Sequence, residues 1–137
     1  MKELRGRCLC GAVEYAVPDD FKYAGYCHCS ECRKFSGSAF SAFGGVPLDS
    51  LRVLSGLQSI SRYPKSEATT LVFCNTCGSS LYAEKPKRGM VHIRLGVLDI
   101  APTLHPGFHS HVDSKAPWYE INDGLPQFKA SRTTSIT

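Results

Sequence analysis

The residues of clearest chemical interest are the seven cysteines of this 137-residue chain. In order they are Cys8, Cys10, Cys27, Cys29, Cys32, Cys74 and Cys77. The first two and the last two form close pairs, and the middle three are clustered. Four thiolates complete a tetrahedral zinc site, whereas three leave one coordination position for water or substrate. The spacing therefore predicts two zinc ions per chain, one in a closed structural site and one in an open catalytic site.

The two cysteine pairs are the predicted structural ligands. Cys74 and Cys77 form a C-x-x-C followed by Gly78, which is typical of a zinc knuckle that needs a second pair. Cys8 and Cys10 can supply that pair, because side chains at i and i+2 of an extended segment point to one face. This pairing would pin the amino terminus to the middle of the chain and stabilise a small core.

The three clustered cysteines are the predicted catalytic ligands. Cys27 and Cys29 again stand at i and i+2, and Ser30 is placed to cap a short helical turn over residues 31–35. Such a turn would bring Cys32 back beside the pair, so that all three thiolates share one metal. A fourth protein ligand, for example a histidine, would instead close this site and make it structural.

Polar neighbours of this cluster are candidate substrate contacts. Arg33 and Lys34 follow the last cysteine and would attract carboxylates of a substrate, and Ser36 would donate a hydrogen bond. The alternative is that both cations only form the solvated end of the helical turn. His28 lies between two ligands, so on an extended segment it would point to the other face, which favours packing or support of the ligands.

The other histidines and the single tryptophan carry weaker signals. His92 alternates within an apolar strand, and His105 reads as a loop residue beside a proline. His109 and His111 share one face of a C-terminal segment without a nearby cysteine. Trp118 is expected in the core rather than in a pocket wall.

The elements that must position these residues are short strands. Segments rich in β-forming residues recur at residues 12–17, 39–43, 51–54, 60–63, 70–73, 80–84 and 90–95. Turn formers separate them, and Gly44-Gly45 is expected to be one such turn. No window sustains a long helical period. The pattern predicts a mainly β fold of short antiparallel strands with little helix.

Length and composition favour one domain. A hydrophobic content of 42% and a charged content of 20% are ordinary for a globular chain of this length. We expect the domain to span residues 1–128, with residues 108–128 as an extended arm over the core, and residues 129–137 to form a polar tail. The sequence leaves the oligomeric state open.

Charge and compartment exclude some function classes. The chain has no apolar run of membrane-spanning length, and its first residues lack the apolar core of a signal peptide, so we expect a cytoplasmic protein without a membrane partner. In that reducing compartment clustered cysteines are metal ligands rather than disulfides. Seven thiolates remove seven charges and two zinc ions add four, which lowers the formal charge from +4 to +1. With no run of basic residues, nucleic acid is not an expected partner.

The motifs together resemble a known family. The order C-x-C-G from Cys8, C-H-C-x-x-C-R-K-x-S-G from Cys27 and C-x-x-C-G from Cys74 is similar to the glutathione-dependent formaldehyde-activating (GFA) family, which includes centromere protein V. The segments S-K-A-P-W from Ser114 and L-P-Q-F from Leu125 also resemble that family. The resemblance implies an Mss4-like β fold and assigns the two zinc sites to the cysteine groups described above.

The resemblance also implies an activity, the reversible addition of glutathione to formaldehyde, which is a carbon–sulfur lyase reaction of the S-(hydroxymethyl)glutathione synthase type. The partner would then be a small thiol–aldehyde adduct, and the open zinc would accept the substrate sulfur and lower its thiol pKa. One alternative is a non-catalytic zinc module that binds a protein. Another is a redox sensor whose clustered cysteines oxidise and release zinc.

Overall fold

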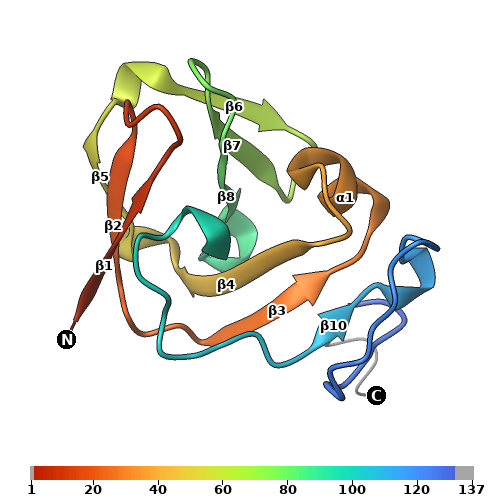
Figure 1. Cartoon of the computed structure of the whole chain (residues 1–137). Coiled ribbons are helices and arrows are strands. Elements are labelled where there is room, and N and C mark those ends of the chain that lie inside the picture. The colour runs from red at the N-terminus through yellow and green to blue at the C-terminus, as the bar shows by residue number, and fades with distance from the viewer. Residues whose placement is uncertain (1, 132–137) are drawn as a thin grey trace.

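The computed structural model describes residues 2–131, which form ten strands and one α-helix joined by short 3-10 turns (Figure 1). The strands are β1 (Glu3–Arg7), β2 (Glu14–Pro18), β3 (Tyr23–Cys27), β4 (Ser41–Pro47), β5 (Arg52–Ser55), β6 (Ile60–Pro64), β7 (Thr70–Cys74), β8 (Ser80–Lys85), β9 (Met90–Arg94) and β10 (His109–Ser110). The helix is α1 (Ser30–Ser36). The prediction of a mainly β fold with little helix is confirmed.

The strands form two sheets. The larger one has seven strands in the order β10-β3-β4-β9-β8-β7-β6, and the smaller one has the order β1-β2-β5. Every strand pair is antiparallel except β10 with β3. Figure 1 shows β1, β2 and β5 on one side of the molecule, with α1 and β10 on the other. Among the described residues no helix is long and apolar enough to cross a membrane.

The two faces of the large sheet contact different parts of the molecule. Because side chains alternate along a strand, Val91 and Ile93 of β9 point to one face and His92 and Arg94 to the other. The first pair belongs to the main core, which fills the space against the small sheet. The second pair lines a pocket. The large sheet therefore separates the core from the pocket.

The expected turn at Gly44-Gly45 is wrong, because both residues lie in the middle of β4. A Cβ atom on Gly44 would lie 2.3 Å from the ring of Phe21, and one on Gly45 would lie 2.4 Å from the ring of Tyr23. The glycines leave room for two aromatic rings that lie across the strand. Their role here is close packing in a sheet rather than a change of chain direction.

The C-terminal arm continues the edge of the large sheet. Tyr26 N donates to the Phe108 carbonyl and His28 N to the Ser110 carbonyl, each at 2.9 Å. The expectation of a buried Trp118 is wrong, since 72% of this residue is exposed, while Ala116 of the same arm is buried. Most of the expected tail at residues 129–137 lies outside the described residues. Within the described part, Ala130 accepts a hydrogen bond from His111 N.

Candidate metal centres and pocket

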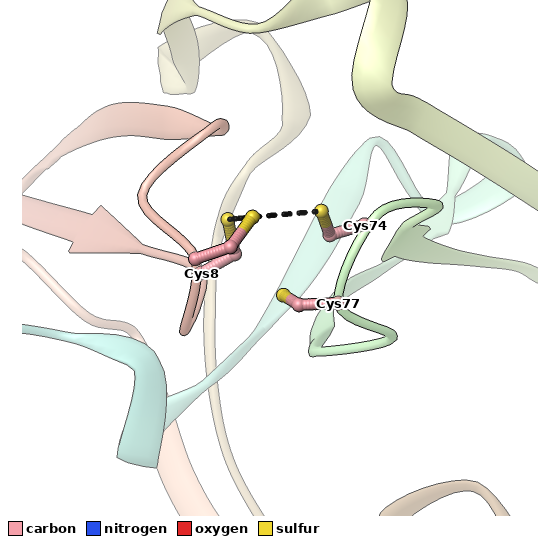
Figure 2. Close-up of side chains that lie close together, drawn as sticks. Cys8, Cys74 and Cys77 are labelled. Carbon is pink, nitrogen blue, oxygen red and sulfur yellow. Dashed lines mark hydrogen bonds between the residues drawn. The ribbon is translucent and has the colours of Figure 1, made fainter.

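The first candidate centre is the set of four cysteines. The sulfur atoms of Cys8, Cys10, Cys74 and Cys77 all lie within 4.8 Å of one another. The Cys8–Cys10 distance is 3.6 Å and the Cys10–Cys74 distance is 3.8 Å. A zinc–sulfur bond of about 2.3 Å places tetrahedral sulfurs about 3.8 Å apart, so this set fits a zinc ion. Figure 2 shows Cys8 facing Cys74 and Cys77 across the gap between two loops.

Two tight turns hold these four sulfurs. Gly11 has a φ of +81° and donates its N–H to the Cys8 carbonyl, so Cys8 and Cys10 lie on a turn after β1 and not on the extended segment that we expected. Gly78 has a φ of +82° and donates to the Cys74 carbonyl in the same way. Both glycines occupy the left-handed conformation that other residues rarely adopt. The pairing of the amino terminus with the middle of the chain follows from these facing turns.

Hydrogen bonds favour the thiolate form of Cys77, one of these four ligands. The Val13 N–H lies 3.2 Å from Cys8 Sγ, and the Ser79 hydroxyl lies 3.2 Å from Cys77 Sγ. The Ser79 hydroxyl, followed by the backbone N–H groups of Ser79 and Cys10, lowers the pKa of Cys77 to about 5. A thiolate is the form that binds zinc, so these contacts favour the ligating state.

The second candidate centre is the set Cys27, Cys29 and Cys32, whose sulfurs also lie within 4.8 Å of one another. Among the described residues no fourth histidine, cysteine or carboxylate joins this group. Three sulfurs fit a tetrahedral ion with one position left for a ligand from elsewhere. The described residues thus supply no histidine that would close the site.

The helix α1 brings the third sulfur back to the first two. It begins after Cys29, whose Sγ accepts a hydrogen bond from Cys32 N at 3.3 Å. The capping residue is therefore Cys29 rather than the expected Ser30, because the cysteine sulfur itself occupies the acceptor position. The thiols of Cys27 and Cys32, followed by the Cys32 N–H and the Lys65 ammonium, hold the pKa of Cys29 far below its usual range.

A pocket of about 420 Å³ lies against the three cysteines. Its apolar wall includes Phe35, Phe43, Leu71 and Phe108, and its basic side chains are Lys65, Lys85, Arg88 and Arg94. Volume and mixed lining suit a site for a small molecule. Sequence reasoning missed these basic residues. The alternation of His92 and Arg94 with buried Val91 and Ile93 was a signal that could have found one of them.

The expected contacts Arg33, Lys34 and Ser36 do not line this pocket. Successive residues of a helix are turned by about 100°, so a helix that presents Cys32 to the pocket turns the next two residues away. Arg33 and Lys34 line a shallow depression beside Trp118 instead. The Ser36 hydroxyl donates to the Cys32 carbonyl at 2.7 Å, so it closes the helix rather than facing a ligand.

The histidines lie in three different settings. His28 points away from the cysteine pair and is fully buried, and its Nε2 lies 2.8 Å from Nδ1 of His109. His109 Nε2 in turn lies 2.8 Å from a carboxylate oxygen of Asp123. His92 is buried in the pocket wall, and His111 also lines the pocket. His105 is exposed.

Comparison with known proteins finds a matching protein family. Residues 3–114 match the profile of the family described as glutathione-dependent formaldehyde-activating enzyme. The chain is 32% identical over 82 residues to an uncharacterized lyase of Schizosaccharomyces pombe, covering 60% of this chain and 58% of that protein. It is 29% identical over 116 residues to a candidate glutathione-dependent formaldehyde-activating enzyme of Penicillium rubens, covering 82% of this chain and 61% of that protein.

A solved structure is also similar. A crystal structure of a Rhodobacter sphaeroides protein aligns with a TM-score of 0.61 at 27% identity, over 72% of this chain and 91% of that chain. The two curated relatives are longer than the region that they share with this chain, which spans about three fifths of each.

Proposed function

The chain belongs to the glutathione-dependent formaldehyde-activating family, and we propose that it is a zinc enzyme that adds a thiol, with glutathione as the first candidate, to formaldehyde or a related aldehyde. The observation that carries the proposal is the set Cys27, Cys29 and Cys32, which lacks a fourth ligand among the described residues and lies at a pocket. A site with only a structural task would be closed by a fourth ligand.

The proposed reaction balances without an oxidant or a reductant. In the forward direction the thiol sulfur forms a bond to the aldehyde carbon, the carbon–oxygen double bond becomes a single bond, and the thiol proton ends on that oxygen. In the reverse direction the carbon–sulfur bond breaks and the aldehyde is released. The enzyme class is therefore a carbon–sulfur lyase of the S-(hydroxymethyl)glutathione synthase type.

Two cysteine sets would hold the metal. Cys27, Cys29 and Cys32 would bind the catalytic zinc, and the four-cysteine set would bind the structural zinc. When bound at the first set, zinc supplies a Lewis acid that favours a thiolate over a thiol and polarises an aldehyde oxygen. Cysteines that bind metal must stay reduced, so the proposal places the protein in a reducing compartment such as the cytoplasm.

The pocket wall offers a neutral polar pair for the aldehyde end. The Tyr23 hydroxyl lies 2.8 Å from His92 Nε2. Burial, followed by the charges of Lys85, Arg88 and Arg94, lowers the pKa of His92 to about 2, so the ring is neutral at pH 7. The Tyr23 hydroxyl also accepts from Arg88 Nη2 at 3.3 Å, so the pair presents a fixed polar surface to the aldehyde end of the adduct.

The test is the exchange rate between formaldehyde, glutathione and their adduct, measured by NMR with the zinc-loaded protein and its Cys27→Ala variant. We expect acceleration by the parent protein and none by the variant. The variant should keep one zinc ion per chain and the circular dichroism spectrum of the parent. Equal rates with and without parent protein that carries two zinc ions would overturn the proposal.

A further inference from the structure

Basic side chains outnumber acidic ones in the pocket. Lys65, Lys85, Arg88 and Arg94 line it, and Glu31 is the one carboxylate among its described lining residues. Glu31 pairs with Lys65 at 2.6 Å. The other three basic residues form no ion pair with a carboxylate in the described part of the chain. The pocket therefore holds positive charge that the described protein does not balance.

Arg94 is the basic residue associated with the cysteines. It is mostly buried, its Nη1 donates to the Ser41 hydroxyl at 2.9 Å, and its guanidinium lies 5.7 Å from the Phe35 ring centre. Burial lowers the pKa of Arg94, and the negative charge of the cysteines, Cys32 first, opposes that shift. Three thiolates with one zinc ion carry one net negative charge, which one guanidinium balances. This leaves two unbalanced cations.

Lys85 and Arg88 lie on the turn between β8 and β9. Lys85 ends β8, and Arg88 ends the short 3-10 turn Pro86–Arg88. The Lys85 ammonium donates to the Thr69 hydroxyl at 2.9 Å, and Arg88 Nη2 lies 3.3 Å from the Tyr23 hydroxyl. Hydroxyl partners orient a cation without balancing its charge. Both groups retain N–H donors for an anion.

The environment of Lys85 penalises its unbalanced charge. Burial, followed by the charges of Lys65 and Arg88, lowers the pKa of Lys85. An anion placed between Lys85 and Arg88 would remove this penalty and would gain charge-assisted hydrogen bonds.

We propose that Lys85 and Arg88 bind a carboxylate of the thiol substrate, so that the site selects thiols that carry a carboxylate group several atoms from the sulfur. The inference rests on the proposed thiol chemistry of the same pocket. It goes beyond that proposal because it assigns specificity to two residues on the β8–β9 turn. Neutral thiols of similar size would lack this contact.

The probe is S-methylglutathione, whose capped sulfur cannot add to an aldehyde. Its affinity for the zinc-loaded full chain would be measured by calorimetry for the parent, Lys85→Met, Arg88→Gln and Lys87→Met. Lys87 is the matched control, because it lies between the two residues on the same turn but pairs with Glu67 and does not line the pocket. Inorganic phosphate and the diethyl ester of the probe are the comparison ligands.

We expect Lys85→Met and Arg88→Gln each to weaken binding of S-methylglutathione by about tenfold or more, as for hydrogen bonds to charged groups. Lys87→Met should bind within about twofold of the parent, and the diethyl ester should bind the parent weakly. Parent-like binding by both variants, equal loss in the Lys87 variant, or phosphate binding as tight as that of the probe would overturn the inference. Because the probe does not react, retained binding without turnover would contradict the lyase proposal alone.

Discussion

Nε2 of His28 lies 2.8 Å from Nδ1 of His109, and neither ring is exposed by more than 1%. On the far side, His109 Nε2 lies 2.8 Å from the Asp123 carboxylate, which can only accept. A neutral His109 ring in this arrangement carries its proton on Nε2 and accepts on Nδ1 from His28. Through His109, the Asp123 carboxylate thus fixes the ring of His28, which lies between Cys27 and Cys29 in the sequence.

Replacing Asp123 by Ala should loosen this chain of hydrogen bonds. The His109 Nε2–H would lose its acceptor, and we expect the free energy of unfolding to fall by about 1 kcal/mol, since water can reach the half-exposed position. Urea unfolding at pH 7.5 measures the change. Nitrogen-15 NMR should also show that the imidazole protons of both rings are no longer fixed. Asp113→Ala, at an exposed position of the same arm, is the control and should leave both readouts unchanged.

The free energy of unfolding should depend on pH through the protonation of His92. Its folded pKa of about 2 lies below the ordinary value of 6.5, because of burial first and then Lys85, Arg88 and Arg94. Below pH 6.5 the unfolded chain therefore binds a proton at His92 that the folded chain does not bind. The stability that the neutral ring contributes to the folded state is complete well above pH 6.5 and is lost as the pH falls. From pH 6 to pH 5 the parent should lose about 1.2 kcal/mol more of its free energy of unfolding than His92→Gln does. Equal slopes in urea titrations of both proteins would contradict the assignment.

Both cysteine sets should bind zinc, but only the four-cysteine set should contribute clearly to thermal stability. We expect about two zinc ions per chain in the parent and about one in either Cys77→Ala or Cys32→Ala, measured by inductively coupled plasma mass spectrometry. Only Cys77→Ala should unfold at a clearly lower temperature, because its set joins the amino terminus to the end of β7. Similar losses of stability in both variants would show that both sites are structural.

Gly45 should not tolerate a methyl group. A Cβ atom there would lie 2.4 Å from the Tyr23 ring, so Gly45→Ala must displace a side chain of the pocket wall. We expect a loss of about 1–3 kcal/mol in the free energy of unfolding. Gly96→Ala is a suitable comparison, since its Cβ atom would meet no atom within 4 Å and its φ is not positive. Denaturant unfolding measures the free energy of unfolding of both variants, and equal values would contradict the prediction.

The sequence predicted features that depend on neighbours along the chain. The alternation of apolar residues located most strands, and the cysteine spacing grouped the ligands, because both signals lie within a few residues. Strands β1 and β3 were missed, and in β1 the apolar pattern is interrupted by Gly6 and two arginines. The Gly44-Gly45 pair was misread because the rings that require glycine come from a different segment.

The substrate side of the site was less accessible to sequence reasoning. Strand register and the direction of α1 decide which basic side chains face the pocket. Neither can be predicted from the local sequence. Arg33 and Lys34 adjoin the cysteines in sequence yet lie outside the pocket, whereas Lys85 and Arg88 come from a distant turn. Trp118 is exposed, whereas the smaller side chains Phe108, His109 and Ala116 of the same arm are buried.

The separation of core and pocket by one sheet has a consequence for how such a protein can diversify. Cys74 packs in the main core behind the sheet, whereas Cys27 packs beside the pocket in front of it. On β9, His92 and Arg94 can therefore change the lining of the pocket while Val91 and Ile93 keep their contacts in the core. The lining of the pocket and the packing of the core are therefore carried by alternate residues of the same strand.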